Sequence, residues 1–426
     1  MISMNAIAWT GLFIVIGVIL RANVKWLRNN LVPASVIGGV LGMLIMQTGI
    51  VWNATSDQFT AIAGQLWSFS FANMGLTLAA KKIESKKNKT MKEKMADSQF
   101  SGICGMGFFW VIPYALTALL GYITLMIIGP SFGMDPVYGL QVPFGFAQGP
   151  GQSVTYGTMM QNNGVVDAVQ VGVTFAAAGF LVAFGIGVPW GKKGIRKGLA
   201  PYAGEMKGGI YEPQEQQWYG KETTHSGSVD TLAFHVALVG VAWVIGQFCC
   251  KLFGMLPGFA GEMLSGFLYL YAMLAGYAIR HLIVKWGLDK YLDRGTQIRI
   301  SGFCIDMMVT AAFMGISLSV IGKWIVPILV VIIVSTIFTY VTTRYFGERF
   351  GGKHGFERTV AIWGVLTGTN PTGQALCRMV DPDRKTSVLE EMGPINAVNV
   401  PACYVVMPAI ISYSAGQPSP YSSNPV

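Results

Sequence analysis

Two glycine-rich segments share one pattern, Gly145-Phe-Ala-Gln-Gly-Pro-Gly-Gln-Ser153 and Gly364-Val-Leu-Thr-Gly-Thr-Asn-Pro-Thr-Gly-Gln374. Each contains Gly-x3-Gly, then a proline and a Gly-Gln pair, and each lies among long apolar stretches. Glycine and proline break helices, and a broken helix at membrane depth is tolerated only where it is buried in protein or lines a water-filled cavity. Two such breaks in the two halves of a chain predict a transporter binding site.

The composition is that of a membrane protein. Of the 426 residues, 52% are hydrophobic and 12% are charged, whereas a soluble domain carries about 25% charged residues. The apolar runs at 103–128, 231–250 and 324–341 approach or reach the length of about 20 residues that spans a bilayer. The net charge of +9 does not indicate a nucleic-acid partner, because the basic residues fall between the apolar runs.

The apolar pattern predicts an all-α polytopic membrane protein with ten spans and two re-entrant hairpins. The hairpins cover 137–162 and 359–380, around the two glycine-rich segments. The spans are expected at 6–20, 33–51, 59–80, 100–128, 166–190, 230–250, 258–279, 300–321, 324–343 and 393–414.

The basic residues orient these spans. With the N-terminus outside, 28 of the 30 lysines and arginines fall on the cytoplasmic side, and only Lys251 and Lys323 fall outside. Cytoplasmic loops carry an excess of Lys and Arg, and turning either hairpin into a simple span would reverse every later loop. We therefore expect an inner-membrane protein with both termini outside and with cytoplasmic loops at 81–97 and 191–228.

Each half then has five spans and one hairpin, and an odd number of spans inverts the second half relative to the first. The expected organisation is a first repeat at 1–190, a cytoplasmic linker at 191–228 and a second repeat at 229–426. Gly151-Gln152 matches Gly373-Gln374 at an offset of 222 residues, and Met74-Gly-Leu-Thr-Leu78 matches Met314-Gly-Ile-Ser-Leu318 at an offset of 240. The hairpin tips are expected to meet near the membrane midplane from opposite sides.

The hairpins suit a small anionic solute. Broken helices present free N–H groups and positive dipole ends, which bind carboxylates. The alternative is that glycine and proline only allow close helix packing here. The predicted substrate-binding residues are Gly149, Gly151, Gln152, Ser153, Thr369, Asn370, Thr372, Gly373 and Gln374.

Polar residues in the third and eighth spans suggest an ion-coupling site, with sodium as the coupling ion. Its candidates are Ser70 and Asn73 in the third span, and Asp306 and Thr310, one turn apart, in the eighth. An intramembrane carboxylate is costly and usually functional. The alternatives are hydrogen bonds between helices for the hydroxyls and an ion pair for Asp306. Arg378, after the second hairpin, could bind a substrate carboxylate or anchor the chain at the inner surface.

The chain resembles the bacterial glutamate:sodium symporters over most of its length. The resemblance rests on Pro33-Ala-Ser-Val-Ile-Gly-Gly39, on Gly151-Gln152-Ser153 followed by Thr174-Phe175 and Gly185-Ile-Gly-Val-Pro189, on Gly368-Thr-Asn-Pro-Thr372, and on Gly393-Pro394 with Val405-Val-Met-Pro408. It implies sodium-coupled uptake of glutamate or a related acidic amino acid or dicarboxylate. It also implies alternating access and a homodimer whose transport domain moves against a scaffold. Gln148-Gly-Pro-Gly-Gln-Ser153 departs from the Gly-Gly-His-Gly-Thr-Gly typical of the family.

Other functions remain open. A channel is possible because Asn370-Pro-Thr372 on a hairpin is similar to the half-helices of aquaporins, and opposed half-helices also make pores. Proton-coupled transport of an organic anion is a second alternative. Paired catalytic aspartates, zinc-protease motifs and nucleotide-binding loops are absent from the sequence, which argues against an enzyme or a primary pump. The six cysteines show no pairing or metal spacing, and no cofactor is expected.

Overall fold

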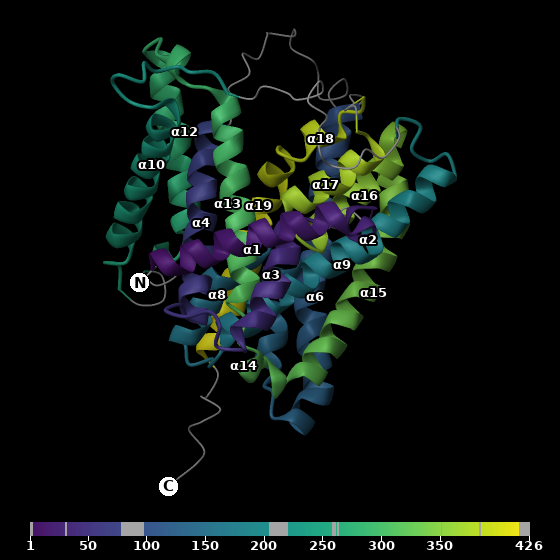
Figure 1. Ribbon diagram of the computed structural model, residues 1–426. Coiled ribbons are helices and arrows are strands. Elements are labelled where there is room, and N and C mark those ends of the chain that lie inside the picture. The colour runs from purple at the N-terminus through teal and green to yellow at the C-terminus, as the bar shows by residue number, and fades with distance from the viewer. Residues whose placement is uncertain are drawn as a thin grey trace.

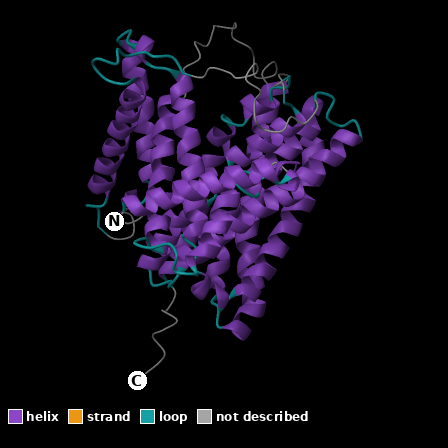
Figure 2. Ribbon diagram, in the orientation of Figure 1, coloured by secondary structure: helices purple, strands orange, loops and turns teal. Residues whose placement is uncertain are grey.

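The computed structural model of the chain describes residues 3–29, 32–77, 98–203, 220–257, 261, 264–350, 352–382 and 385–416. Within these residues the protein consists of helices and loops, without strands (Figure 2). Six of its helices are long and apolar enough to cross a membrane, so the chain is a polytopic membrane protein. The expected loop 81–97 lies outside the described residues, as do residues 204–219 of the linker and 417–426 at the C-terminus.

A helix overlaps each of the ten predicted spans, and the helix in the span predicted at 258–279 begins at Leu268. These helices are α1 (Met4–Asn23), α3 (Ala34–Met46), α4 (Ser56–Thr77), α6 (Ser98–Ile128), α9 (Ala168–Arg196), α10 (Thr231–Phe253), α12 (Leu268–Lys285), α13 (Arg294–Met314), α15 (Ile325–Phe350) and α19 (Ile395–Ala415).

The remaining helical elements are short or belong to the two hairpins. The hairpins contain η2 (Pro136–Gln141), α7 (Val142–Phe146), α8 (Pro150–Asn162), α16 (Gly355–Leu366) and α17 (Asn370–Val380). The connections contain α2 (Lys25–Asn29), η1 (Gly129–Phe132), α14 (Leu318–Gly322), η4 (Asp289–Tyr291), η5 (Gly352–His354) and α18 (Val388–Glu391).

Side-chain caps fix where two helices of the second half begin. Asp230 accepts hydrogen bonds from two backbone amides of the first turn of α10, and Asp293 accepts one from Thr296 N at 2.6 Å at the start of α13. The buried His235 joins these two starts: its Nδ1 lies 2.7 Å from Thr231 O, and its Nε2 accepts from Asp293 N at 2.8 Å. Both ring nitrogens are therefore engaged, and His235 links the starts of α10 and α13.

The helices form two bundles (Figure 1). The first bundle consists of α1, α3, α4, α10, α12 and α13. The second bundle consists of α6, α9, α15 and α19, packed around the two hairpins. The bundles meet where α8 packs on α4 and where α8 and α9 contact α13. Both hairpins therefore belong to one bundle, and the first hairpin also forms its interface with the other.

Close backbone contact holds the first bundle together at α4 and α12. A Cβ added at Gly75 would overlap Met273 O, and one added at Gly276 would overlap Ala72 O. Small residues let membrane helices approach until their backbones touch, where van der Waals packing replaces the hydrophobic effect. Gly75 lies in the Met74–Leu78 segment that the repeat analysis singled out, so its packing explains why a glycine stands there.

We expect Gly75→Val to push α4 away from α12, because the new side chain has no room. Overpacking of this kind costs about 1–3 kcal/mol. The midpoint of thermal unfolding of the purified protein in detergent should fall. Gly240→Val in α10 is the control, because a Cβ at Gly240 meets nothing within 4 Å. An equal loss in both variants would mean that valine in a helix, and not the contact with α12, is responsible.

Candidate functional site

Both glycine-rich segments break a helix. Ala147, Gln148 and Gly149 separate α7 from α8, and residues 367–369 separate α16 from α17. Gly149 has a φ of 82°, a conformation that residues with a side chain rarely adopt, and Pro150 occupies the first position of α8. The sequence therefore specifies the first break through a glycine that turns the chain and a proline that starts the next helix.

In the second hairpin the two helices fold back on each other. A Cβ at Gly364 would lie 2.6 Å from Gly373 Cα, and one at Gly373 would lie 2.5 Å from Ala361 O. These distances are shorter than any normal contact, so α16 and α17 pack backbone to backbone through glycine. The first hairpin packs its short α7 on α8, and Gly145 of α7 lies directly against α9.

The tips of the two hairpins touch. A Cβ at Gly149 would overlap Thr369 Cγ2 and would lie 3.6 Å from Gly368 O. Helix α9 supports both tips, because a Cβ at its Gly179 would lie 2.6 Å from Thr367 O and 3.4 Å from Phe146 Cα. Two segments more than 200 residues apart thus meet at one point, with α9 beside them.

This meeting point gathers the positive ends of two helices. The first turns of α8 and α17 both begin here, and their leading N–H groups have no acceptor within their own helices. The Thr369 and Thr372 hydroxyls lie 3.1 Å apart, and the Ser153 hydroxyl donates to Gly149 O at 3.2 Å. Free N–H groups, hydroxyls and the N-termini of two helices thus lie together, and such groups can bind a carboxylate.

A buried polar face of the first hairpin extends from this point. Gln148, Gln152 and Tyr156 follow one another at intervals of four residues. Gln148 Oε1 accepts from the Tyr114 hydroxyl at 3.1 Å, and the Tyr156 hydroxyl lies 3.2 Å from that of Tyr269. Between them, Gln152 is only 3% exposed and its Oε1 has no hydrogen-bond partner. A buried acceptor without a donor could accept a hydrogen bond from a ligand ammonium group.

The second hairpin repeats this face at the offset of 222 residues. Asn370, Gln374 and Arg378 correspond to Gln148, Gln152 and Tyr156 and share their spacing. Gln374 Nε2 donates to Asn370 Oδ1 at 3.1 Å, and Asn370 Nδ2 donates to Met392 O at 2.7 Å. Unlike Tyr156, Arg378 is exposed. The spacing could have been read from the sequence, whereas Tyr114 and Tyr269 come from other spans and carry no such signal.

The predicted ion-coupling residues fall into two groups. Asp306 and Thr310 both contact Ser35 at the start of α3: its side chain hydrogen-bonds the Asp306 carboxyl group, and its backbone oxygen accepts from Thr310 Oγ1 at 2.9 Å. Asp306 is itself exposed. The sequence analysis missed Ser35 as a partner, although it lies in the Pro33–Gly39 segment.

Asn73 belongs to the other group. Its amide nitrogen donates to Gln297 O at 2.6 Å and to Ser301 Oγ at 2.7 Å, so it ties α4 to α13. The Ser70 hydroxyl donates to Trp67 O of its own helix at 2.8 Å. The described residues hold no group of three or more His, Cys, Asp or Glu side chains that could bind a metal ion. A cation here would depend on carboxylate, hydroxyl and carbonyl oxygens, which suit a hard ion.

Comparisons with known proteins find similar sequences. The model of the sodium/glutamate symporter family matches residues 108–364. The sodium/glutamate symporters of Escherichia coli (strain K12) and Shigella flexneri are each 20% identical to the chain over 377 residues. The match covers 87% of this chain and 85% of each relative.

The contact between the hairpin tips can be tested without a ligand. Gly149→Ala should lower the free energy of unfolding, because alanine at positive φ costs about 1–2 kcal/mol and its methyl group overlaps Thr369. Adding Thr369→Ser removes the Thr369 methyl group and should recover the part due to the contact, measured by unfolding in mixed detergent micelles. Gly164→Ala is the matched control, because Gly164 has a φ of 91° and a Cβ there meets nothing within 4 Å. If the effects of Gly149→Ala and Thr369→Ser on the free energy of unfolding simply add in the double variant, the contact between the tips is contradicted.

Proposed function

Because this chain belongs to the sodium/glutamate symporter family, we propose that it accumulates glutamate, or a closely related acidic amino acid or dicarboxylate, by symport with sodium through alternating access. It is a transport protein and not an enzyme. In this proposal it lies in the inner membrane as a homodimer, as its family resemblance implies.

The contact between the first turns of α8 and α17 carries the proposal. Two helix N-termini that converge on one point offer N–H groups and positive potential to both oxygens of a carboxylate. The unpaired Gln152 Oε1 and the hydroxyls of Tyr156 and Tyr269 are acceptors suited to an ammonium group. A site that offers donors for carboxylate and acceptors for ammonium suits an amino acid better than a simple dicarboxylate.

The packing of the first bundle supports an inverted duplication. Helix α1 packs on α3 as α10 packs on α12, and α3 packs on α13 as α12 packs on α4. In addition, α1 touches α13 as α10 touches α4. Exchanging α1 with α10, α3 with α12 and α4 with α13 leaves these contacts unchanged, which is the symmetry that an inverted repeat predicts.

Contacts between connections support the proposed orientation. Gly295 approaches Gly220, and Gly194 approaches Phe356. Described parts of the linker 191–228 therefore lie next to the starts of α13 and α16, which follow other basic segments of the chain. Lys323, one of the two outside basic residues, lies 3.3 Å from Asp167 near the other ends of the helices. This arrangement agrees with hairpins that enter from opposite sides, the first from outside and the second from the cytoplasm.

Uptake by purified protein in liposomes tests the function. With sodium outside, labelled glutamate should accumulate above its equilibrium level, and replacing sodium by choline should abolish accumulation. Equilibration that ignores the ion gradient would indicate a channel. Accumulation that follows a proton gradient and ignores sodium would indicate proton-coupled anion transport. A panel of aspartate, succinate and 2-oxoglutarate separates amino acids from dicarboxylates.

Asp306→Asn keeps the size of the side chain and removes its charge. If Asp306, with Ser35 and Thr310, serves the coupling ion, the sodium concentration for half-maximal uptake should rise by about tenfold, which corresponds to about 1.4 kcal/mol of binding. Ser35→Ala should produce a smaller shift in the same direction. Asp289→Asn, at an exposed position in η4, serves as the control. Unchanged sodium dependence in Asp306→Asn would assign the carboxylate a structural role.

A further inference from the structure

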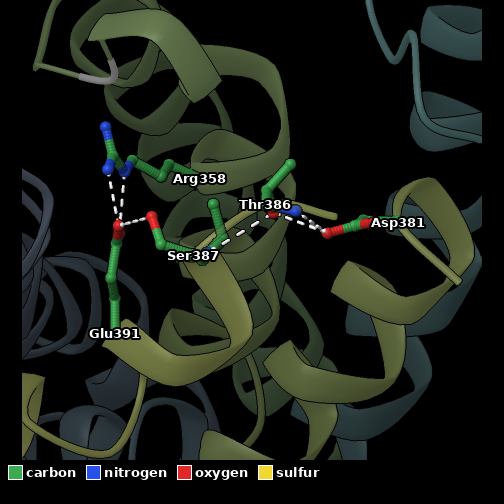
Figure 3. Close-up of polar contacts among 6 residues, drawn as sticks. Arg358, Asp381, Thr386, Ser387 and Glu391 are labelled. Carbon is green, nitrogen blue, oxygen red and sulfur yellow. Dashed lines mark hydrogen bonds and ion pairs between the residues drawn. The ribbon is translucent and has the colours of Figure 1, made fainter. Parts of the chain in front are cut away.

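A buried ion pair fixes the base of the second hairpin, at the end opposite the tip. Arg358 of α16 donates to Glu391 of α18 through Nε at 2.8 Å and through a terminal nitrogen at 2.6 Å, and both side chains are almost completely buried (Figure 3). The Ser387 hydroxyl donates to Glu391 Oε1 at 2.6 Å. The charge of Arg358 is thus balanced by Glu391 through two parallel hydrogen bonds.

A second buried carboxylate beside this pair is satisfied by neutral donors. Asp381 follows α17 and accepts from Lys385 N and Thr386 N at 2.8 Å each and from Thr386 Oγ1 at 2.6 Å (Figure 3). These bonds satisfy its oxygens and tie Asp381 to Lys385 and Thr386. All three donors are neutral groups, so these bonds do not offset a negative charge on Asp381.

Glu357, next to Arg358 in the first turn of α16, differs from the carboxylates of Glu391 and Asp381. It is 2% exposed, and its Oε1 has no hydrogen-bond partner. Asp381 repels its negative charge, while Arg358 attracts it but is already bound to Glu391. An ionised carboxylate that is buried with one oxygen unpaired is strongly disfavoured, so such a group takes up a proton or a cation instead.

Burial, a backbone N–H group and two neighbouring charges act on the protonation of Glu357. Burial and the charge of Asp381 raise the pKa of Glu357, and its own backbone N–H and Arg358 offset only part of this rise. Among the side chains that the structure describes, the other acidic, basic and thiol groups on the elements packed against α16 are Cys104 of α6, His354 of η5, Cys377 and Arg378 of α17, Glu391 of α18, Arg344 and Arg349 of α15, and Lys192, Lys193 and Arg196 of α9.

We infer that Glu357 is a proton-binding site that controls the base of the second hairpin. With the proton bound, the base closes around Arg358 and Glu391 as described here. When the proton leaves, the two carboxylates of Glu357 and Asp381 repel each other and the base loosens. The proton-binding site does not depend on which solute is carried. Only its location on the cytoplasmic side of the membrane rests on the proposed function.

The direction of the pH dependence follows from the raised pKa. A carboxyl group that holds its proton more tightly in the closed base than in the open one favours the closed base fully at low pH. This contribution is lost as the pH rises through the raised pKa of Glu357, by up to about tenfold in the closed-to-open ratio per pH unit. Glu357→Gln carries no titrating group, so its base should stay closed at every pH.

Cys377 reports the opening directly. It is 1% exposed in α17, and its thiol lies in the electrostatic field of Glu357, Asp381 and Glu391. In a variant with Cys377 as its only cysteine, we would measure the rate of maleimide labelling in detergent from pH 5 to pH 8.5, with and without Glu357→Gln. The ratio of the parent's rate to that of Glu357→Gln removes the effect of pH that the two proteins share. The charge of Glu357 itself disfavours the Cys377 thiolate, so this direct effect slows labelling of the parent and acts against the expected rise of the ratio.

This ratio should be near one at pH 5 and should rise about tenfold by pH 8.5, while Glu222→Gln, at an exposed position, follows the parent protein. A ratio that stays constant with pH would overturn the proposal. The midpoint of thermal unfolding is a second readout: it should fall with rising pH more steeply in the parent than in Glu357→Gln. If replacing sodium by choline at constant pH changes the labelling of the parent but not of Glu357→Gln, the site binds sodium and the proton assignment is wrong.

Discussion

The contact between Gly149 and Thr369 is the constraint on which the rest of the structure depends. Two helices can end in the middle of a membrane only if their free backbone groups find partners or a polar ligand. The two breaks lie together, because Gly149 approaches Thr369 and Gly179 of α9 brings both tips against one helix. In the proposed membrane topology, the first-turn N–H groups of both hairpins therefore lie at one shared point.

Glycine makes this arrangement possible for a different reason at each place. At Gly149 the backbone conformation excludes most side chains. At Gly364 and Gly373 the limit is the distance between α16 and α17, and at Gly151 it is the indole ring of Trp67, which a Cβ would overlap. The last contact lies between the bundles, so the first hairpin fits against the first bundle as closely as it fits within its own.

The sequence predicted much of this architecture because its strongest signals are local. Apolar runs of span length and the two Gly-Pro breaks predicted a helix within each expected span and a helix break in each glycine-rich segment. The contact between the tips was also predicted, from the matched positions of the breaks. Tyr114 and Tyr269 could not be predicted, because their roles arise from packing between distant spans.

The burial of charged side chains also could not be predicted from the sequence. Arg358 was counted with the basic residues of a cytoplasmic loop, yet it is 1% exposed and bound to Glu391. Charge counting assigns a side of the membrane to a residue, but it cannot tell a solvated arginine from one that is buried with a carboxylate 33 positions later. That distinction depends on how α18 packs at the base of the hairpin.

The two hairpins place equivalent polar faces in different environments. Gln152 and Tyr156 of the first are buried, whereas Gln374 is half-buried and Arg378 is exposed in the second. Under the proposed inverted repeat and alternating access, such a difference between equivalent surfaces would separate the two sides of the membrane. Exchanging the two environments would then open the opposite side. The first hairpin would then lose its cover of Tyr114 and Tyr269, which lie in different bundles. The polar face of α8 is covered by residues of both bundles, whereas the equivalent face of α17 reaches the surface at Arg378. A movement between the bundles could therefore exchange the two environments without changing the helix packing within either bundle.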